Sequence, residues 1–223
     1  MAKEKKEKGS TPSLILIGGI FAVISMLFVI FSTLGAVVTY TTLPFRPLVI
    51  IGFPFLIPVL NTGYSITSQL VGELGVGPSA SMFNAGLIIT GILMLPVFPS
   101  HYMIFKGSKL AKIGAVCGVL GALGCTAIGL SPPVLSTHHL PAALVFFIFS
   151  GVAIILLSVK MFHGTFFPRV LAIYGFFFVV VDVLFLVLGT EFTITQWAVF
   201  LVIVTWILAM GVWVLVKRKE IEA

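Results

Sequence analysis

The chain has 223 residues, of which 59% are hydrophobic and only 9% are charged. A soluble domain carries roughly 25% charged residues, so this composition excludes water as the main solvent and indicates an integral membrane protein. The formal charge of +6 does not indicate nucleic-acid binding, because the basic residues flank apolar stretches, where anionic lipid headgroups are the nearest partners.

Six apolar stretches, each close to the roughly 20 residues that cross about 30 Å of hydrocarbon, predict membrane-spanning helices. The first is too long for the apolar region of a secretory signal, so we expect a retained anchor. The fold class is therefore all-α, a polytopic six-transmembrane-helix bundle in a single integral membrane domain, residues 1–223. In chain order the predicted helices are 14–40, 81–104, 113–130, 139–159, 170–189 and 195–216.

The Lys and Arg residues predict how the chain crosses the membrane. Twelve of the thirteen lie in the two tails or near two of the connections, and Arg46 is the exception. Because basic residues in short loops stay on the cytoplasmic side, both tails, 1–12 and 217–223, are predicted to be cytoplasmic in a multi-pass protein of the cell membrane.

Residues 42–80 are predicted to form an outer cap loop. The apolar run 47–60 within it is too short for a span, and Pro54 and Pro58 each remove a backbone donor. We expect it to lie in or dip into the membrane interface with irregular backbone. Residues 65–75 are predicted to form a short helix that places Gln69 and Glu73 on one face.

The third predicted helix carries a ridge of small residues that favours close helix packing, within the bundle or at a dimer face. Cys117 and Cys125 on this helix are separated by about 12 Å of rise, too far for a disulfide, and are interpreted as packing residues. The ridge consists of Gly114, Gly118, Ala122, Cys125 and Gly129.

Outside the tails, the acidic residues are Glu73, Asp182 and Glu191, all in the predicted outer half. Asp182 lies about 20 Å along its helix from Arg169 and therefore within the hydrocarbon. A carboxyl group at that depth is expected to face the bundle interior, where it is paired or protonated and serves either a function or a structural hydrogen bond.

His138 and His139 precede the fourth predicted helix and are candidate acid–base residues, together with Glu73 and Asp182. Neighbouring residues on a helix diverge by about 100°, so the pair does not match the i, i+4 spacing of a zinc site. His138, His139 and Glu191 are weak metal candidates that need other ligands to converge, and capping of backbone groups is the commoner role.

Tyr64, Asn84 and Arg46 complete a predicted polar outer site, with Asn84 placed to cap or bridge helices. No GxSxG, HExxH, paired CxxC or phosphate-binding glycine loop is present, so acyl transfer, zinc hydrolysis and nucleotide chemistry lack their usual sequence support. No cofactor is predicted.

Four short segments carry a resemblance to a known family: GYS at 63–65, GELG at 72–75, FNAG at 83–86 and HHLPAA at 138–143. In these the chain resembles the domain-of-unknown-function 998 family of six-helix membrane proteins, distantly like the Frag/DRAM/Sfk group. The resemblance implies a six-helix bundle with an outer polar surface, and it implies no particular activity.

Three functions follow as hypotheses. The first is a non-enzymatic subunit of a membrane assembly or a lipid-binding protein, whose partners are membrane lipids, partner subunits or a second copy of the chain. The second is an enzyme acting on outer-leaflet lipid or lipid-linked headgroups, with His138 or His139 as acid or base. The third is proton-linked transport through Asp182.

Overall fold

The computed structural model describes residues 2–40, 45–50, 53–58, 63–76, 79–132, 137–188 and 193–222, with the side chains of 2–12, 45–50, 53–58 and 222 left aside. The elements in chain order are α1 Ala2–Val38, β1 Phe45–Ile50, β2 Phe53–Pro58, η1 Val71–Gly75, α2 Ala80–Met94, α3 Val97–Ile104, α4 Lys109–Leu130, α5 His139–His163, α6 Arg169–Leu188, α7 Thr193–Val216 and α8 Arg218–Glu222.

Within the described residues, six helical segments are long and apolar enough to cross a membrane, which confirms the predicted all-α polytopic bundle. Large apolar side chains also face outward, and Phe31 is 69% exposed and Phe177 52% exposed. Such an apolar exterior matches lipid as the surrounding solvent. The six segments are Ser13–Val38, Ala80–Ile104, Lys109–Leu130, His139–His163, Arg169–Leu188 and Thr193–Val216.

The helices differ from their predicted bounds in several places: α1 begins at Ala2 instead of residue 14, and α5 ends at His163 instead of residue 159. Two further differences have a local cause. The second segment consists of α2 and α3, which are separated at Leu95 and Pro96, because Pro96 lacks an N–H group and Pro99 soon removes another. The third segment, α4, begins at Lys109 instead of residue 113. The side chain of Ser108 accepts a hydrogen bond from the Ala111 N–H at 3.3 Å and so caps the helix earlier.

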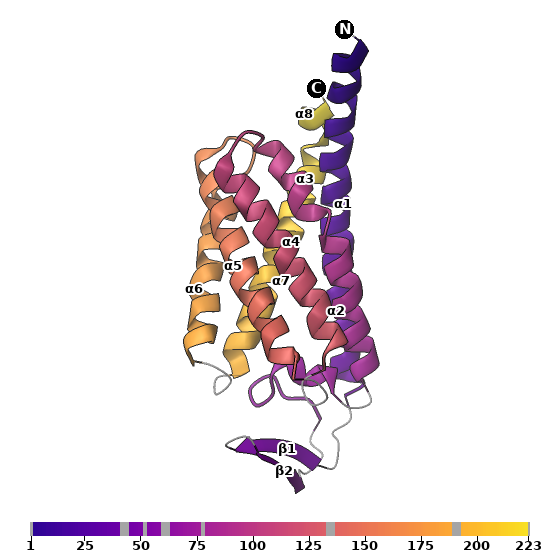
Figure 1. Ribbon diagram of the computed structural model, residues 1–223, viewed down its shortest axis with the longest axis vertical. Coiled ribbons are helices and arrows are strands. Elements are labelled where there is room, and N and C mark those ends of the chain that lie inside the picture. Colours follow the sequence, from indigo (N-terminus) through magenta and orange to yellow (C-terminus); the bar gives the residue numbers. More distant parts are fainter. Residues whose placement is uncertain are drawn as a thin grey trace.

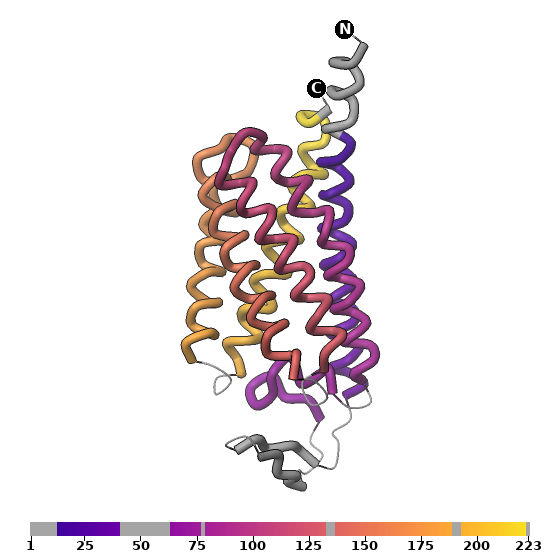
Figure 2. The backbone as a smooth tube through the Cα atoms, in the orientation of Figure 1, coloured from indigo at the N-terminus to yellow at the C-terminus, as the bar shows by residue number. Residues whose placement is uncertain are grey.

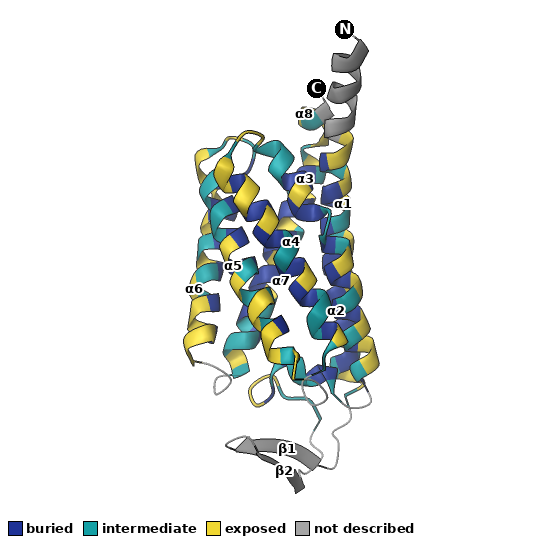
Figure 3. Ribbon diagram, viewed as in Figure 1, coloured by how far each residue is buried: buried dark blue, intermediate teal, exposed yellow. Residues whose placement is uncertain are grey.

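The spanning helices form a closed ring. Each packs against its neighbours in the order α1, α2, α4, α5, α6 and α7, and α7 returns to α1. Buried positions lie on the inward faces of these helices, as Figure 3 shows.

Both chain termini lie at the same end of the bundle in Figure 1, and this terminal end also carries the α3–α4 and α5–α6 connections. The opposite end is called the cap end, because segment 63–76 lies across it (Figure 2).

Residues 45–50 and 53–58 form strands, which corrects the prediction of irregular backbone there. Strands β1 and β2 pair antiparallel, with Phe45 opposite Pro58 and Ile50 opposite Phe53. Aromatic and β-branched residues favour strands, and both strands of a two-stranded sheet are edges, where proline is tolerated.

The small residues of α4 pack within the bundle, which confirms the predicted close packing. A Cβ atom on Gly129 would stand 2.6 Å from the Asn84 carbonyl oxygen of α2, and one on Gly124 would stand 2.6 Å from the Phe146 backbone nitrogen of α5. Only glycine permits these approaches. Cys125, like Cys117, is a buried free thiol.

Candidate functional site

A network of polar and aromatic side chains fixes segment 63–76 to the helices. The Tyr64 hydroxyl donates to the Leu70 carbonyl oxygen at 2.8 Å and accepts from the Trp197 indole N–H at 3.1 Å. The Gln69 amide donates to the Tyr40 hydroxyl at 2.9 Å. Tyr40, Tyr64, Gln69 and Trp197 are called the cap network, and they join α1 and α7 through the cap.

The Tyr64 ring lies between two other aromatic rings of the cap network. Its centroid is 5.2 Å from that of Tyr40 and 5.8 Å from that of Trp197, both in edge-to-face geometry. Burial raises the pKa of the Tyr64 hydroxyl above its usual range, and the hydrogen bond from Trp197 only partly opposes this. The phenol is therefore held in its neutral form.

The helix predicted over residues 65–75 is shorter than expected. Gln69 closes a turn by accepting the Ser65 N–H at 2.7 Å, and a 3-10 helix then covers only Val71–Gly75. Glu73 accepts the Leu70 N–H at 3.2 Å. Gln69 and Glu73 thus stabilise consecutive turns instead of sharing a helix face.

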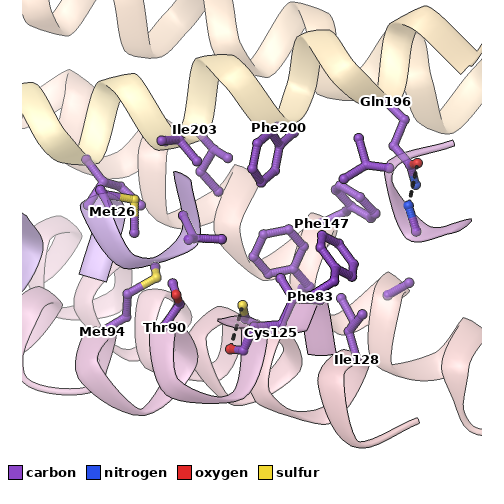
Figure 4. A pocket seen from close by; sticks show the side chains of 18 of the residues that line it. Met26, Phe83, Thr90, Met94, Cys125, Ile128, Phe147, Gln196, Phe200 and Ile203 are labelled. Carbon is purple, nitrogen blue, oxygen red and sulfur yellow. Dashed lines mark hydrogen bonds between the residues drawn. The ribbon is translucent and has the colours of Figure 1, made fainter. Parts of the chain in front are cut away.

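An apolar cavity of about 90 Å³ lies beneath η1, between α1, α2, α4, α5 and α7. The aromatic rings of Phe83, Phe147 and Phe200 line it (Figure 4). Phe146 also lines it. One water needs roughly 10–15 Å³ of such space, so the cavity holds more than a single water-sized group. The apolar lining of the cavity favours an apolar occupant.

The few polar groups of the cavity divide into two sets. Deep in the bundle, the Thr90 hydroxyl donates to the Ser25 carbonyl oxygen at 3.3 Å and the Cys125 thiol to the Leu87 carbonyl oxygen at 3.5 Å, so both are satisfied by backbone. At the cap end, the Gln196 side-chain oxygen accepts the Gly72 N–H at 3.3 Å. Figure 4 shows Gln196 at the opposite side of the cavity from Met26 and Met94.

His139 belongs to the polar rim at the cap end. Its Nδ1 is 2.7 Å from the Ser131 carbonyl oxygen, and since a carbonyl only accepts, Nδ1 carries the proton. Its Nε2 would stand 3.9 Å from a Cβ atom on Gly72 and so lies close to η1. His138 precedes α5 on the exposed surface and does not line the cavity.

Asp182 faces the bundle interior, as predicted, and is only 3% exposed. Its Oδ2 would stand 2.7 Å from a Cβ atom on Gly151, so α5 carries glycine where the carboxyl group approaches. Its Oδ1 has no hydrogen-bond partner among the described residues. Asp182 does not line the cavity, and the structure therefore separates it from His139.

The remaining predicted site residues have structural roles or lie outside the described part. The Asn84 amide donates to the Gly75 carbonyl oxygen at 3.1 Å, which confirms that it bridges elements, here α2 and η1. Arg46 lies in β1, and its side chain is outside the described residues, as is all of Glu191. Among the described residues, no three His, Cys, Asp or Glu side chains are placed to hold a metal ion.

Sequence reasoning missed Gln196 and Tyr40 as site residues. Gln196 lies in the first turn of α7 with Thr193 and Thr195, next to Trp197. This pattern is a signal of an interfacial position but not of contact with η1. That contact joins residues 124 positions apart and depends on how the helices pack.

A model of the protein family of unknown function DUF998 matches residues 46–213, which is most of the chain. The chain belongs to the DUF998 family. The resemblance seen in the short sequence segments is thereby confirmed, while the more distant likeness to the Frag/DRAM/Sfk group stays a prediction. No curated protein and no solved structure matches this DUF998 chain. The matched region contains η1, His139 and Gln196 and nearly all the cavity.

Proposed function

We propose that this DUF998 protein is a non-enzymatic membrane protein that binds an amphiphilic, lipid-class molecule. Its apolar part occupies the cavity between the helices, and its polar part meets the rim formed by Gln196 and His139. The observation that carries this proposal is the cavity itself, which is lined by apolar side chains and has polar groups only at defined places.

The physical chemistry of the cavity favours an apolar chain over water. Ligand sites are concave and mostly apolar, with a few placed polar groups that set orientation. The deep polar groups, Thr90 and Cys125, already bond to backbone, so water gains little there. Flexible thioethers of Met26 and Met94 adapt to chains of irregular shape.

We further propose that the cap end faces the outside of the cell and that both termini are cytoplasmic. One observation supports this orientation. The terminal end gathers the termini and the α3–α4 and α5–α6 connections in Figure 1. Lys106 lies in the first connection, Lys160 and Arg169 flank the second, and basic connections stay inside. The cavity rim then lies toward the outer leaflet, which would supply the ligand.

The proposal is tested by filling the cavity. Ala143 lines it from α5, and its neighbour Leu144 is 42% exposed on the lipid-facing side. We expect A143F to displace a bound fluorescent fatty acid, with at least tenfold weaker binding in neutral detergent, because the added ring occupies the site. The matched variant L144F adds a ring outside the cavity and is expected to bind as the wild type does.

Thermal unfolding of both variants shows whether they are folded. Wild-type protein that binds the probe no better than folded A143F would overturn the proposal. The variant Q196L distinguishes the contribution of the rim to binding from that of the cavity. It is expected to weaken binding of a fatty acid more than binding of an uncharged alkane probe.

Asp182 supports a second candidate, proton-linked transport, because a buried carboxyl oxygen without a described partner is a potential proton site. Reconstituted vesicles with an imposed pH gradient would test it. Proton flux that D182N abolishes would favour transport, whereas D182N with unchanged fatty-acid binding and no wild-type flux would favour the lipid-binding function.

A further inference from the structure

A second pocket lies at the terminal end of the bundle, where the α3–α4 turn meets the end of α5. Its volume is about 410 Å³, and it is open to the surroundings. Unlike the cavity beneath η1, its lining is mainly polar, and Lys106, Ser108, Lys160 and His163 contribute to it. None of the acidic side chains that the structure describes lines it.

Two glycines allow these two turns to approach each other. Gly107 has φ of +91°, a left-handed conformation that favours glycine, and it redirects the chain between Lys106 and Ser108. A Cβ atom on Gly164 would stand 3.0 Å from the Lys160 carbonyl oxygen and 3.7 Å from a ring carbon of Phe105. The fold therefore brings Lys106 and Lys160, which are far apart in sequence, to one pocket.

The pocket has a net positive charge even when the partial charges at the neighbouring helix ends are included. The C-termini of α3 and α5 each add about half a negative charge, and the N-terminus of α4 adds about half a positive charge. With the two lysines, the sum is a net charge of about +1.5 with His163 neutral. The ion pair found among the described residues, Lys217 with Glu220, involves neither pocket lysine.

We propose that this pocket binds a phosphate group, carried either by an anionic phospholipid headgroup or by a soluble phosphate. The lysine ammonium groups supply charge, and the Ser108 hydroxyl can donate, because its oxygen only accepts from Ala111. Helix α4 begins directly after Ser108, and the positive end of its dipole favours an anion beside it. Basic pockets between membrane helices on the cytoplasmic side suit such headgroups.

This site is independent of the proposed cavity function, because the two lie at opposite ends of the bundle. It also differs from a general role of lysines in orienting the chain. The orientation of the chain in the membrane requires only that basic residues lie near the helix ends. The proposed site requires that Lys106 and Lys160 lie in one pocket. Lys109 and Lys112 are exposed and lie close by in sequence, yet they do not line the pocket.

The test uses the full-length chain in neutral detergent, with K106Q/K160Q compared with K109Q/K112Q, which removes the same charge. Phosphatidylglycerol and phosphatidylcholine are titrated separately and detected by native mass spectrometry, and inorganic phosphate is titrated by its effect on thermal unfolding. We expect K106Q/K160Q to bind phosphatidylglycerol roughly 25-fold more weakly, about fivefold per lysine. K109Q/K112Q is expected to stay within about twofold of wild type, because its lysines do not line the pocket.

The outcomes also identify the source of the phosphate group. Binding of phosphatidylglycerol without an effect of inorganic phosphate assigns a lipid headgroup, and a stabilising effect of inorganic phosphate that K106Q/K160Q abolishes assigns a soluble ligand. Equal weakening of binding in both double variants would overturn the proposal. Equal binding of both lipids together with no response to inorganic phosphate would also overturn it. Thermal unfolding without ligand confirms that both double variants are folded.

Discussion

The indole N–H of Trp197 donates to the hydroxyl oxygen of Tyr64 across 3.1 Å, and that hydroxyl donates onward to the Leu70 carbonyl oxygen at 2.8 Å. One side chain of the cap thereby connects the start of α7 with the segment that leads into η1. Because η1 lies over the cavity, this chain of hydrogen bonds holds the cavity rim in place.

Removing the Tyr64 hydroxyl is expected to destabilise the fold. Y64F leaves the Trp197 N–H and the Leu70 carbonyl without their partner, which costs about 1–3 kcal/mol for a buried group. The exposed Tyr174 hydroxyl, which pairs with Thr205, provides the control, and Y174F should change stability by less than about 0.5 kcal/mol. Unfolding of both variants in detergent is the measurement, and equal losses would contradict the role assigned to Tyr64.

Alkaline pH should weaken the same contact. Because the folded-state pKa of Tyr64 is raised, its contribution to stability is fully present below the unfolded pKa of about 10 and is lost as pH rises above that value. Unfolding midpoints recorded between about pH 8 and about pH 11 should fall less steeply for Y64F than for wild type. Identical slopes would show that the Tyr64 phenol does not contribute.

The close contact between α4 and α5 predicts that alanine is tolerated at one glycine of α4 and not at another. An alanine at Gly124 would put its Cβ atom 2.6 Å from the Phe146 backbone nitrogen, whereas at Gly114 the nearest atoms are side-chain carbons at 3.3 Å. Alanine gains up to about 1 kcal/mol of helix propensity, but forcing two backbones apart costs about 1–3 kcal/mol or more. We expect G124A to unfold at lower temperature than wild type and G114A to change little. A G124A protein as stable as G114A would be inconsistent with this helix contact.

The proposed orientation makes a labelling prediction. Both native cysteines are buried, so single introduced cysteines report on their own positions. A membrane-impermeant maleimide should label T67C, an exposed position on the cap, in intact cells, and K109C only after permeabilisation. Labelling of K109C from outside would reverse the orientation and place the phosphate pocket at the outer leaflet.

Part of the site was predictable from sequence. The inward orientation of Asp182 follows from the cost of exposing a carboxyl group to hydrocarbon, wherever its helix packs. The bridging role of Asn84 was likewise expected from a polar residue at a helix start. The separation of Asp182 from His139 could not be predicted from sequence, because it depends on how α6 packs. Helix α6 contributes no residue to the cavity lining. Gln196 was missed because its partner, Gly72, presents a backbone group that carries no sequence signal.

The sequence by itself determined that the chain is a six-span membrane bundle and where each span lies, because the length and apolar character of a helix are local properties set by the thickness of the bilayer. Only the tertiary structure decided that Tyr64 meets Trp197, that five helices enclose a cavity beneath η1, and that Lys106 and Lys160 share a pocket. These features depend on which helix faces pack together, and that choice is made by contacts between residues distant in the chain.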